Sequence, residues 1–223
     1  YEKNSKKVIA KTSKSLILVT PDAERSMNTF LGASLKFNLD SINEVLISKS
    51  RYIYIEGYLF DQKKAKEAIY YCCELAKKNN CKIALSLSDK FCVDRHRSDF
   101  NDLIQKYIDI LFANEKEIMS LFQDSLEKSI NKILKKVEIG AITLGSKGSI
   151  VFEKEKKFHI KPIKISNPID TTGAGDLFAS GFLFGLINFK SIKFCGDLGS
   201  KAAAEIIMHY GARSKVSLKK LLN

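Results

Sequence analysis

A segment at residues 170–176, Asp-Thr-Thr-Gly-Ala-Gly-Asp, carries the residue types best suited to chemistry. The apolar residues that follow predict a helix from Leu177 to about Asn188. The first amides of a helix have no partner within it, and small side chains let an anion approach them closely. Asp176 would repel a phosphate there, so it suits a general base that takes a proton from a substrate hydroxyl. The simpler alternative is an acidic side chain that only complements the helix dipole.

The middle of the chain predicts the elements that must position this segment. Near-continuous apolar strands alternate with amphipathic helices, which is typical of a parallel sheet covered on both faces. Asp61 is the expected N-cap of the second helix. We expect strands at residues 52–55, 82–87, 108–113 and 139–144, and helices at residues 41–48, 61–79, 100–107, 115–122 and 126–136.

Shorter strands flank this region. The opening strands are short, alternate between apolar and polar residues and are expected to be exposed, which favours a small antiparallel sheet. A later pair of strands is predicted to form an antiparallel meander. We therefore expect a small β appendage with its connection over residues 1–35 and a single α/β core over residues 36–223. The expected short strands are residues 7–10, 16–20, 26–31, 148–153 and 157–165.

The helix after residue 176 contains two glycines and several aromatic residues. Gly181 and Gly185 each cost about 1 kcal/mol against Ala in a helix interior. Close packing of this helix on a neighbour would explain them, whereas a loose helix is the alternative. The aromatic residues of this stretch are expected in the core: Phe178, Phe182, Phe184 and Phe189.

The stretch from Asp170 to Leu183, DTTGAGDLFASGFL, resembles the C-terminal signature of the ribokinase-like (PfkB) sugar and nucleoside kinases along its full length. Three shorter matches are TLGSKG at residues 143–148, NEKE at 114–117 and GAR at 211–213. Residues 20–33, 55–61 and 86–100 resemble the bacterial adenosine-kinase-like branch of that family. No P-loop or dinucleotide-binding glycine motif is present in the sequence.

The resemblance implies a fold and a reaction. The fold would be a ribokinase-like three-layer αβα sandwich with a mostly parallel sheet and a small antiparallel β lid. The reaction would be transfer of the γ-phosphate of ATP to a hydroxyl of a nucleoside or sugar, with adenosine the leading acceptor. Asp176 would be the catalytic base, and Gly173, Ala174 and Gly175 would form the anion hole.

The resemblance also implies cofactor contacts. Asn114 and Glu117 would organise Mg²⁺ and the phosphates, although a solvated helix charge is the alternative for Glu117. Asp170, Thr172 and Gly211 would hold a monovalent cation such as K⁺. Ser200 stands where relatives often carry Asn. The residues expected to bind ATP are Thr143, Gly145, Ser146, Gly148, Thr172 and Ser200, of which the two glycines would also suit a plain β-turn.

Composition narrows the class of partner. The formal net charge is +12, but lysine supplies most of it and no basic stripe is interleaved with aromatic residues, so we expect a solvated surface rather than a nucleic-acid site. No apolar run reaches the length of a membrane span. The five cysteines form no zinc pattern and suit buried thiols in a reducing, cytoplasmic setting. We also expect a homodimer through the β lid.

The family resemblance begins near Leu16, and relatives carry a further segment before the equivalent of Tyr1. We therefore expect an N-terminally incomplete member of the family, because that segment supplies the first sheet strand and part of the acceptor site. A sheet without its first strands exposes an edge. These residues alone should bind ATP weakly and phosphorylate poorly. A truncated, non-catalytic nucleotide-binding remnant is the alternative, and another sugar kinase of the family is a second one.

Overall fold

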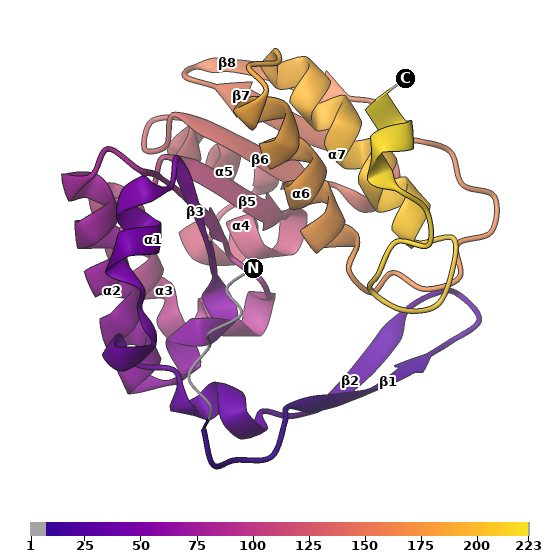
Figure 1. Ribbon diagram of the computed structural model, residues 1–223. Helices are drawn as coiled ribbons and strands as arrows, with labels where there is room; N and C mark the ends of the chain where they lie inside the picture. Colours follow the sequence, from indigo (N-terminus) through magenta and orange to yellow (C-terminus); the bar gives the residue numbers. More distant parts are fainter. Residues whose placement is uncertain (1–7, 223) are drawn as a thin grey trace. The chain divides into compact units, whose positions relative to one another are not determined.

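The computed structural model describes residues 8–222, which form two compact units (Figure 1). The first unit contains Thr29–Ile139 together with the residues up to Ser15. The second contains Leu16–Asn28 and Gly140–Asn223. Each unit brings together two segments that are distant in the sequence.

The first unit is built from parallel strands and the helices that connect them. β3, β4 and β5 lie side by side in that order, with Tyr52 opposite Lys82 and Ala84 opposite Ile110. β4 and β5 are almost continuously buried, as the apolar strands predicted. The elements are η1 (Gly32–Lys36), η2 (Leu39–Ser41), α1 (Glu44–Lys49), β3 (Tyr52–Glu56), η3 (Gly57–Asp61), α2 (Lys63–Lys78), β4 (Lys82–Ser86), α3 (Lys90–Lys106), β5 (Ile110–Asn114), α4 (Glu115–Phe122) and α5 (Leu126–Ile133).

The second unit places two helices beside an antiparallel pair of strands. β7 pairs with β8, with Ser149 opposite Ile160, and α6 and α7 run side by side (Figure 1). A long loop without regular structure joins β8 to α6. The elements are β6 (Ile139–Thr143), η4 (Gly145–Lys147), β7 (Ser149–Glu153), β8 (Lys156–Ile160), α6 (Ala174–Ile187), α7 (Ile192–Ile206) and η5 (Leu218–Leu222).

A two-stranded hairpin precedes the first large helix. β1 (Lys14–Val19) and β2 (Arg25–Phe30) form a separate sheet, and every residue of β2 is exposed. The turn of the hairpin belongs to the second unit, since Leu16–Asn28 is part of it. The expected class is confirmed: the chain has an α/β fold with a mixed, mostly parallel sheet and a small antiparallel sheet.

Some expected elements differ from the structure. Residues 8–10 form no strand, and Lys7 lies outside the described residues. α3 begins ten residues before the expected helix because Asp89 accepts hydrogen bonds from Phe91 N and Cys92 N and caps it. The later strand ends at Ile160 rather than at residue 165. Within residues 8–222, no helix has the length and hydropathy to cross a membrane.

Asp61 was predicted to be a helix cap, and this prediction was wrong. The N-cap of α2 is Gln62, without a side-chain hydrogen bond. Asp61 instead ends η3, and its carboxylate accepts hydrogen bonds from Arg95 Nε and Nη2 at 3.0 and 2.9 Å. His96 Nε2 lies 2.8 Å from Asp61 Oδ1. A guanidinium that binds both carboxylate oxygens outweighs a single capping bond.

Candidate functional site

The segment at residues 170–176 forms the entrance of α6. Gly173 is the N-cap, with φ of 82°, in the left-handed region that favours glycine. Its carbonyl accepts the hydrogen bond of Leu177 N at 2.9 Å, so the helix starts at Ala174, three residues earlier than predicted. Asp176 is exposed in the first turn of the helix. The helix therefore presents small residues and one carboxylate at its positive end.

A cavity of about 870 Å³ opens at this entrance, entirely within the second unit. Ala174 and Gly175 line it from the start of α6. A Cβ atom added at Gly175 would meet nothing within 4 Å, and the same holds at Gly145. Five of the six residues predicted to bind ATP line this cavity, and the buried Thr172 does not: Thr143, Gly145, Ser146, Gly148 and Ser200, on β6, η4, its flanks and α7.

Gly148 shows why this wall has its shape. Its φ is 91°, and an added Cβ would lie 2.1 Å from the carbonyl oxygen of Ile160. Leu144 N donates to Gly148 O at 2.8 Å, which closes the turn. Only glycine fits this position, so the turn and the adjoining edge of the cavity are set by the backbone.

Sequence reasoning missed the other walls of the cavity. The loop after β8 contributes Pro162, Lys164 and Pro168, and two prolines so close together were the available signal for a rigid loop. Asp22 and Glu24 come from the hairpin turn. No local pattern could place them here, since they lie far from residue 170 in the sequence.

Asp170 braces the segment before α6. It is 3% exposed, and Oδ1 accepts hydrogen bonds from Thr172 N at 2.8 Å and from the Thr172 hydroxyl. Oδ2 accepts from Gly211 N at 2.9 Å. Burial acts to raise the pKa of Asp170, but these bonds, with the charge of Arg25, outweigh it and hold the pKa below its usual value.

The three residues predicted to hold a monovalent cation therefore lie together, joined by these bonds. Three donors take three of the roughly four acceptor positions of a carboxylate. This donor set suits a structural brace between the segment and Gly211. Among the described residues, no group of three or more His, Cys, Asp or Glu side chains forms a metal cluster.

Asn114 and Glu117 lie together in the first unit, where β5 leads into α4. Asn114 Oδ1 accepts from Glu117 N at 2.9 Å, and Glu117 Oε2 accepts from Asn114 N at 2.9 Å, which is a capping box. Glu117 is 5% exposed, which differs from the solvated charge considered from the sequence. Burial raises the pKa of Glu117 to about 7, and the nearby charges of Asp89 and Glu56 add to this.

The packing of α6 explains its two inner glycines. A Cβ at Gly181 would lie 2.8 Å from Leu198 O, and one at Gly185 would lie 2.7 Å from Cys195 Sγ. The predicted close approach of a neighbouring helix is confirmed, and α7 is that neighbour.

The prediction of core aromatic residues holds for two of the four. Phe178 and Phe182 are buried, but Phe184 is 46% and Phe189 88% exposed. Phe189 lies beyond the end of α6, where the left-handed backbone turns the chain away from the core.

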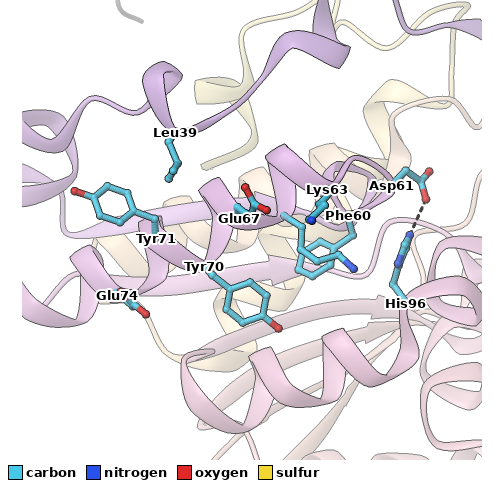
Figure 2. Close-up of a pocket in the computed structure, with 10 residues that line it drawn as sticks. Leu39, Phe60, Asp61, Lys63, Glu67, Tyr70, Tyr71, Glu74 and His96 are labelled. Atoms are coloured by element: carbon cyan, nitrogen blue, oxygen red, sulfur yellow. Dashed lines mark hydrogen bonds and ion pairs between the residues drawn. The ribbon is translucent and has the colours of Figure 1, made fainter.

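A second cavity, of about 710 Å³, lies in the first unit along α2 (Figure 2). Tyr70, Glu67 and Lys63 line it, with Asp61 and His96 at one end. Some of its charged groups are paired: Lys66 Nζ lies 2.6 Å from Asp99 Oδ2, and Asp61 binds Arg95 and His96. None of the residues predicted to function from the sequence lines this cavity, so the α6 entrance is the stronger candidate site.

Comparison with known proteins identifies the family of the chain. The family model described as pfkB family carbohydrate kinase matches residues 4–219. The solved structure of a probable sugar kinase from Rhizobium etli CFN 42 is 40% identical, with a TM-score of 0.92 over 94% of this chain and 64% of that chain. Adenosine kinase from Sinorhizobium meliloti is 37% identical, with a TM-score of 0.92 over 95% of this chain and 65% of that one.

A curated relative is more distant. Adenosine kinase 2 from Arabidopsis thaliana is 28% identical over 207 residues, which are 84% of this chain and 59% of the relative. The chain thus spans less than two thirds of the length of these relatives. The two bacterial structures fit the adenosine-kinase-like branch that the sequence resembles.

Proposed function

The chain belongs to the pfkB family of carbohydrate kinases, and from this premise we propose that it transfers the γ-phosphate of ATP to a hydroxyl of a nucleoside or sugar. One observation carries the proposal. The cavity at the entrance of α6 is lined at once by the glycine turn around Gly145, by Gly175 and by Ser200. A triphosphate needs such a space, because backbone amides and a helix N-terminus stabilise its charge without side chains in the way.

Asp176 performs the proton transfer in this proposal. The substrate hydroxyl oxygen forms a bond to the γ-phosphorus as the bond from phosphorus to the β,γ-bridging oxygen breaks, and the hydroxyl proton passes to the Asp176 carboxylate. In this proposal the amides of Gly173 and Gly175 face the oxygens of the transferring group, whereas the Ala174 amide donates to Thr171 O at 3.3 Å. The positive end of the α6 dipole favours the same charge.

ATP and Mg²⁺ fit the residues present. Mg²⁺ in such sites uses one or two carboxylates together with substrate phosphates, so a dense acidic cluster is not required. When bound, Mg²⁺ would neutralise charge on the phosphates. We propose that Asn114 and Glu117 organise Mg²⁺, as the sequence predicts. The residues proposed to bind ATP include Thr143, Ser146 and Gly148. Thr172 stabilises the segment at residues 170–176 through its hydrogen bonds to Asp170.

Adenosine is the proposed acceptor. The relatives named adenosine kinase, including those from Arabidopsis thaliana and Sinorhizobium meliloti, support this choice. A relative named 5-dehydro-2-deoxygluconokinase, from Clostridium beijerinckii, is also 28% identical, over 192 residues. A sugar acceptor is therefore the second candidate. K⁺ near Asp170 and a homodimer through the hairpin remain predictions, to be checked by cation dependence and by sedimentation.

A phosphotransfer assay tests the proposal. A version of the protein that spans the full length of its relatives would be incubated with ATP, Mg²⁺ and, in turn, adenosine, ribose and fructose phosphates. We expect turnover with adenosine to exceed turnover with the sugars, and D176N to lower the rate by about 10²–10⁴-fold because general base catalysis is lost. S180A, an exposed change in the same helix, is the matched control. Equal rates for D176N and the parent chain would contradict the role of Asp176.

The non-catalytic remnant predicts a different result. It would bind ATP with saturation but show no transfer to any acceptor, and D176N would leave ATP binding unchanged.

A further inference from the structure

The turn of the β1–β2 hairpin has a defined conformation. Thr20 N donates to Glu24 O and Ala23 N donates to Thr20 O, both at 2.9 Å. Ala23 has φ of 63° and is only 1% exposed. The left-handed region is unfavourable for alanine, so contacts outside the turn must hold this conformation.

Thr171 provides those contacts. Its hydroxyl donates to Ala23 O at 3.0 Å, and its backbone N donates to the same oxygen at 3.3 Å. Arg25 Nη1 donates to Thr171 Oγ1 at 2.8 Å. The hydroxyl therefore acts as donor and acceptor at once, and one residue binds both the backbone and a side chain of the turn.

The same residue also touches the entrance of α6. Thr171 O accepts the hydrogen bond of Ala174 N, the first residue of the helix, at 3.3 Å. Thr171 thus binds the hairpin turn through its hydroxyl and amide and the helix entrance through its carbonyl. Asp22, Glu24, Thr171 and Ala174 all line the cavity of about 870 Å³.

The turn also has hydrogen bonds of its own, from the Thr20 hydroxyl to Asp22 and Glu24 O and from Glu24 N to Asp22 Oδ1, but the strands that carry it add little. Two-stranded sheets are marginally stable by themselves, and all of β2 is exposed. A ligand that contacts both the helix entrance and the turn would favour the arrangement in which they are joined, because a ligand shifts a population toward the state that it binds better.

We propose that Thr171 is a positioning residue that couples the hairpin turn to the entrance of α6 and so sets the wall that Asp22 and Glu24 give to the nucleotide cavity. This inference rests on the proposed function, since it takes ATP as the occupant of the cavity. A merely structural role for Thr171 would fasten the hairpin equally in the free and the bound protein.

The test uses T171V, which keeps the shape but removes the hydroxyl, and T171S, which restores it. ATP affinity would be measured by calorimetry for both variants, for R25Q and for the double variant R25Q/T171V. We expect T171V to weaken ATP binding about 5–20-fold, from the loss of hydrogen bonds to a charged group and to the turn. T171S should stay within about twofold of the parent chain, and R25Q should add little to T171V because T171V already removes the hydrogen bond between Arg25 and Thr171.

Hydrogen exchange over residues 16–28 supplies the readout that a structural role would not move. We expect ATP to slow exchange in this segment of the parent chain and of T171S, and to have no such effect in T171V. Parent-like ATP affinity in T171V, equal protection by ATP in all variants, or fully additive losses in the double variant would overturn the coupling. If the parent chain itself binds no ATP, the proposed function fails. In that case the ATP-free proteins still test the contact between Thr171 and the hairpin turn. Equal hydrogen exchange in T171V and the parent chain would reject that contact, whereas faster exchange in T171V would support the contact without the proposed function.

Discussion

The entrances of α4 and α6 differ in what pairs with the amides of the first helical turn. At α4, the Asn114 side chain accepts from Glu117 N, and the Glu117 carboxylate accepts from Asn114 N, so protein atoms pair with amides of the first turn. At α6 the N-cap is Gly173, which has no side chain to cap with, and the next residues line a cavity. A helix entrance closed by its own side chains leaves fewer amides for an anion, whereas one built from small residues is available to an anion.

Removal of the α4 cap should give the largest stability loss in this comparison. N114A deletes the acceptor of Glu117 N and the donor to the buried Glu117 carboxylate. We expect a fall of about 2–4 kcal/mol in the free energy of unfolding, from a lost cap and an unsatisfied buried group. Urea denaturation measures it. S191A, at the exposed N-cap of α7, is the matched control and should cost about 1 kcal/mol. Equal losses for the two variants would show that the α4 cap is not special.

Glu117 should make stability depend on pH. Its pKa is about 7 in the folded protein, against an ordinary value of 4.5, so the folded state holds an extra proton between these values. The stability contribution of this group therefore falls as pH rises from about 4.5 to 7. E117Q should remove about 3 kcal/mol of this fall, seen as a flatter pH profile of the unfolding free energy than in the parent chain. Parallel profiles would contradict the raised pKa.

At the entrance of α6, a substitution that strains the left-handed backbone of Gly173 should lower the free energy of unfolding. G173A places a Cβ at φ of 82° and 3.1 Å from Ala212 Cβ. We expect a loss of about 1–2 kcal/mol in unfolding free energy from the left-handed backbone. Thermal denaturation checks this, and G173N, which tolerates that conformation better, should lose less. An unchanged melting temperature for G173A would mean that the helix does not require this turn.

Local patterns in the sequence were enough to predict the glycine-rich entrance, α4 and the parallel strands. The segment at residues 170–176 combines glycines with a following apolar helix, and α4 begins and ends where the pattern placed it, at Glu115 and Phe122. Gly181 and Gly185 also revealed a close helix contact, because glycine in a helix interior needs such a reason.

Contacts between distant residues were not predictable in this way. Asp61 binds Arg95 and His96 instead of capping α2. The turn at Ala23 accepts a hydrogen bond from Thr171, and no residue spacing in the sequence predicts this contact. The burial of Glu117, and the action of the Asp89 and Glu56 charges on it, likewise depend on residues distant in the sequence. Such features follow from tertiary packing, which overrides local preference.

ATP binding to G175A tests most directly whether the entrance of α6 is an anion site. An added Cβ meets no protein atom within 4 Å, yet Gly175 lines the cavity, so the methyl group takes space only from a ligand. We predict at least a tenfold weaker ATP affinity by calorimetry, about 1.4 kcal/mol, with an unfolding free energy equal to that of the parent chain or higher by up to about 1 kcal/mol. S180A should change neither quantity. Unchanged ATP affinity in a folded G175A protein would contradict the account.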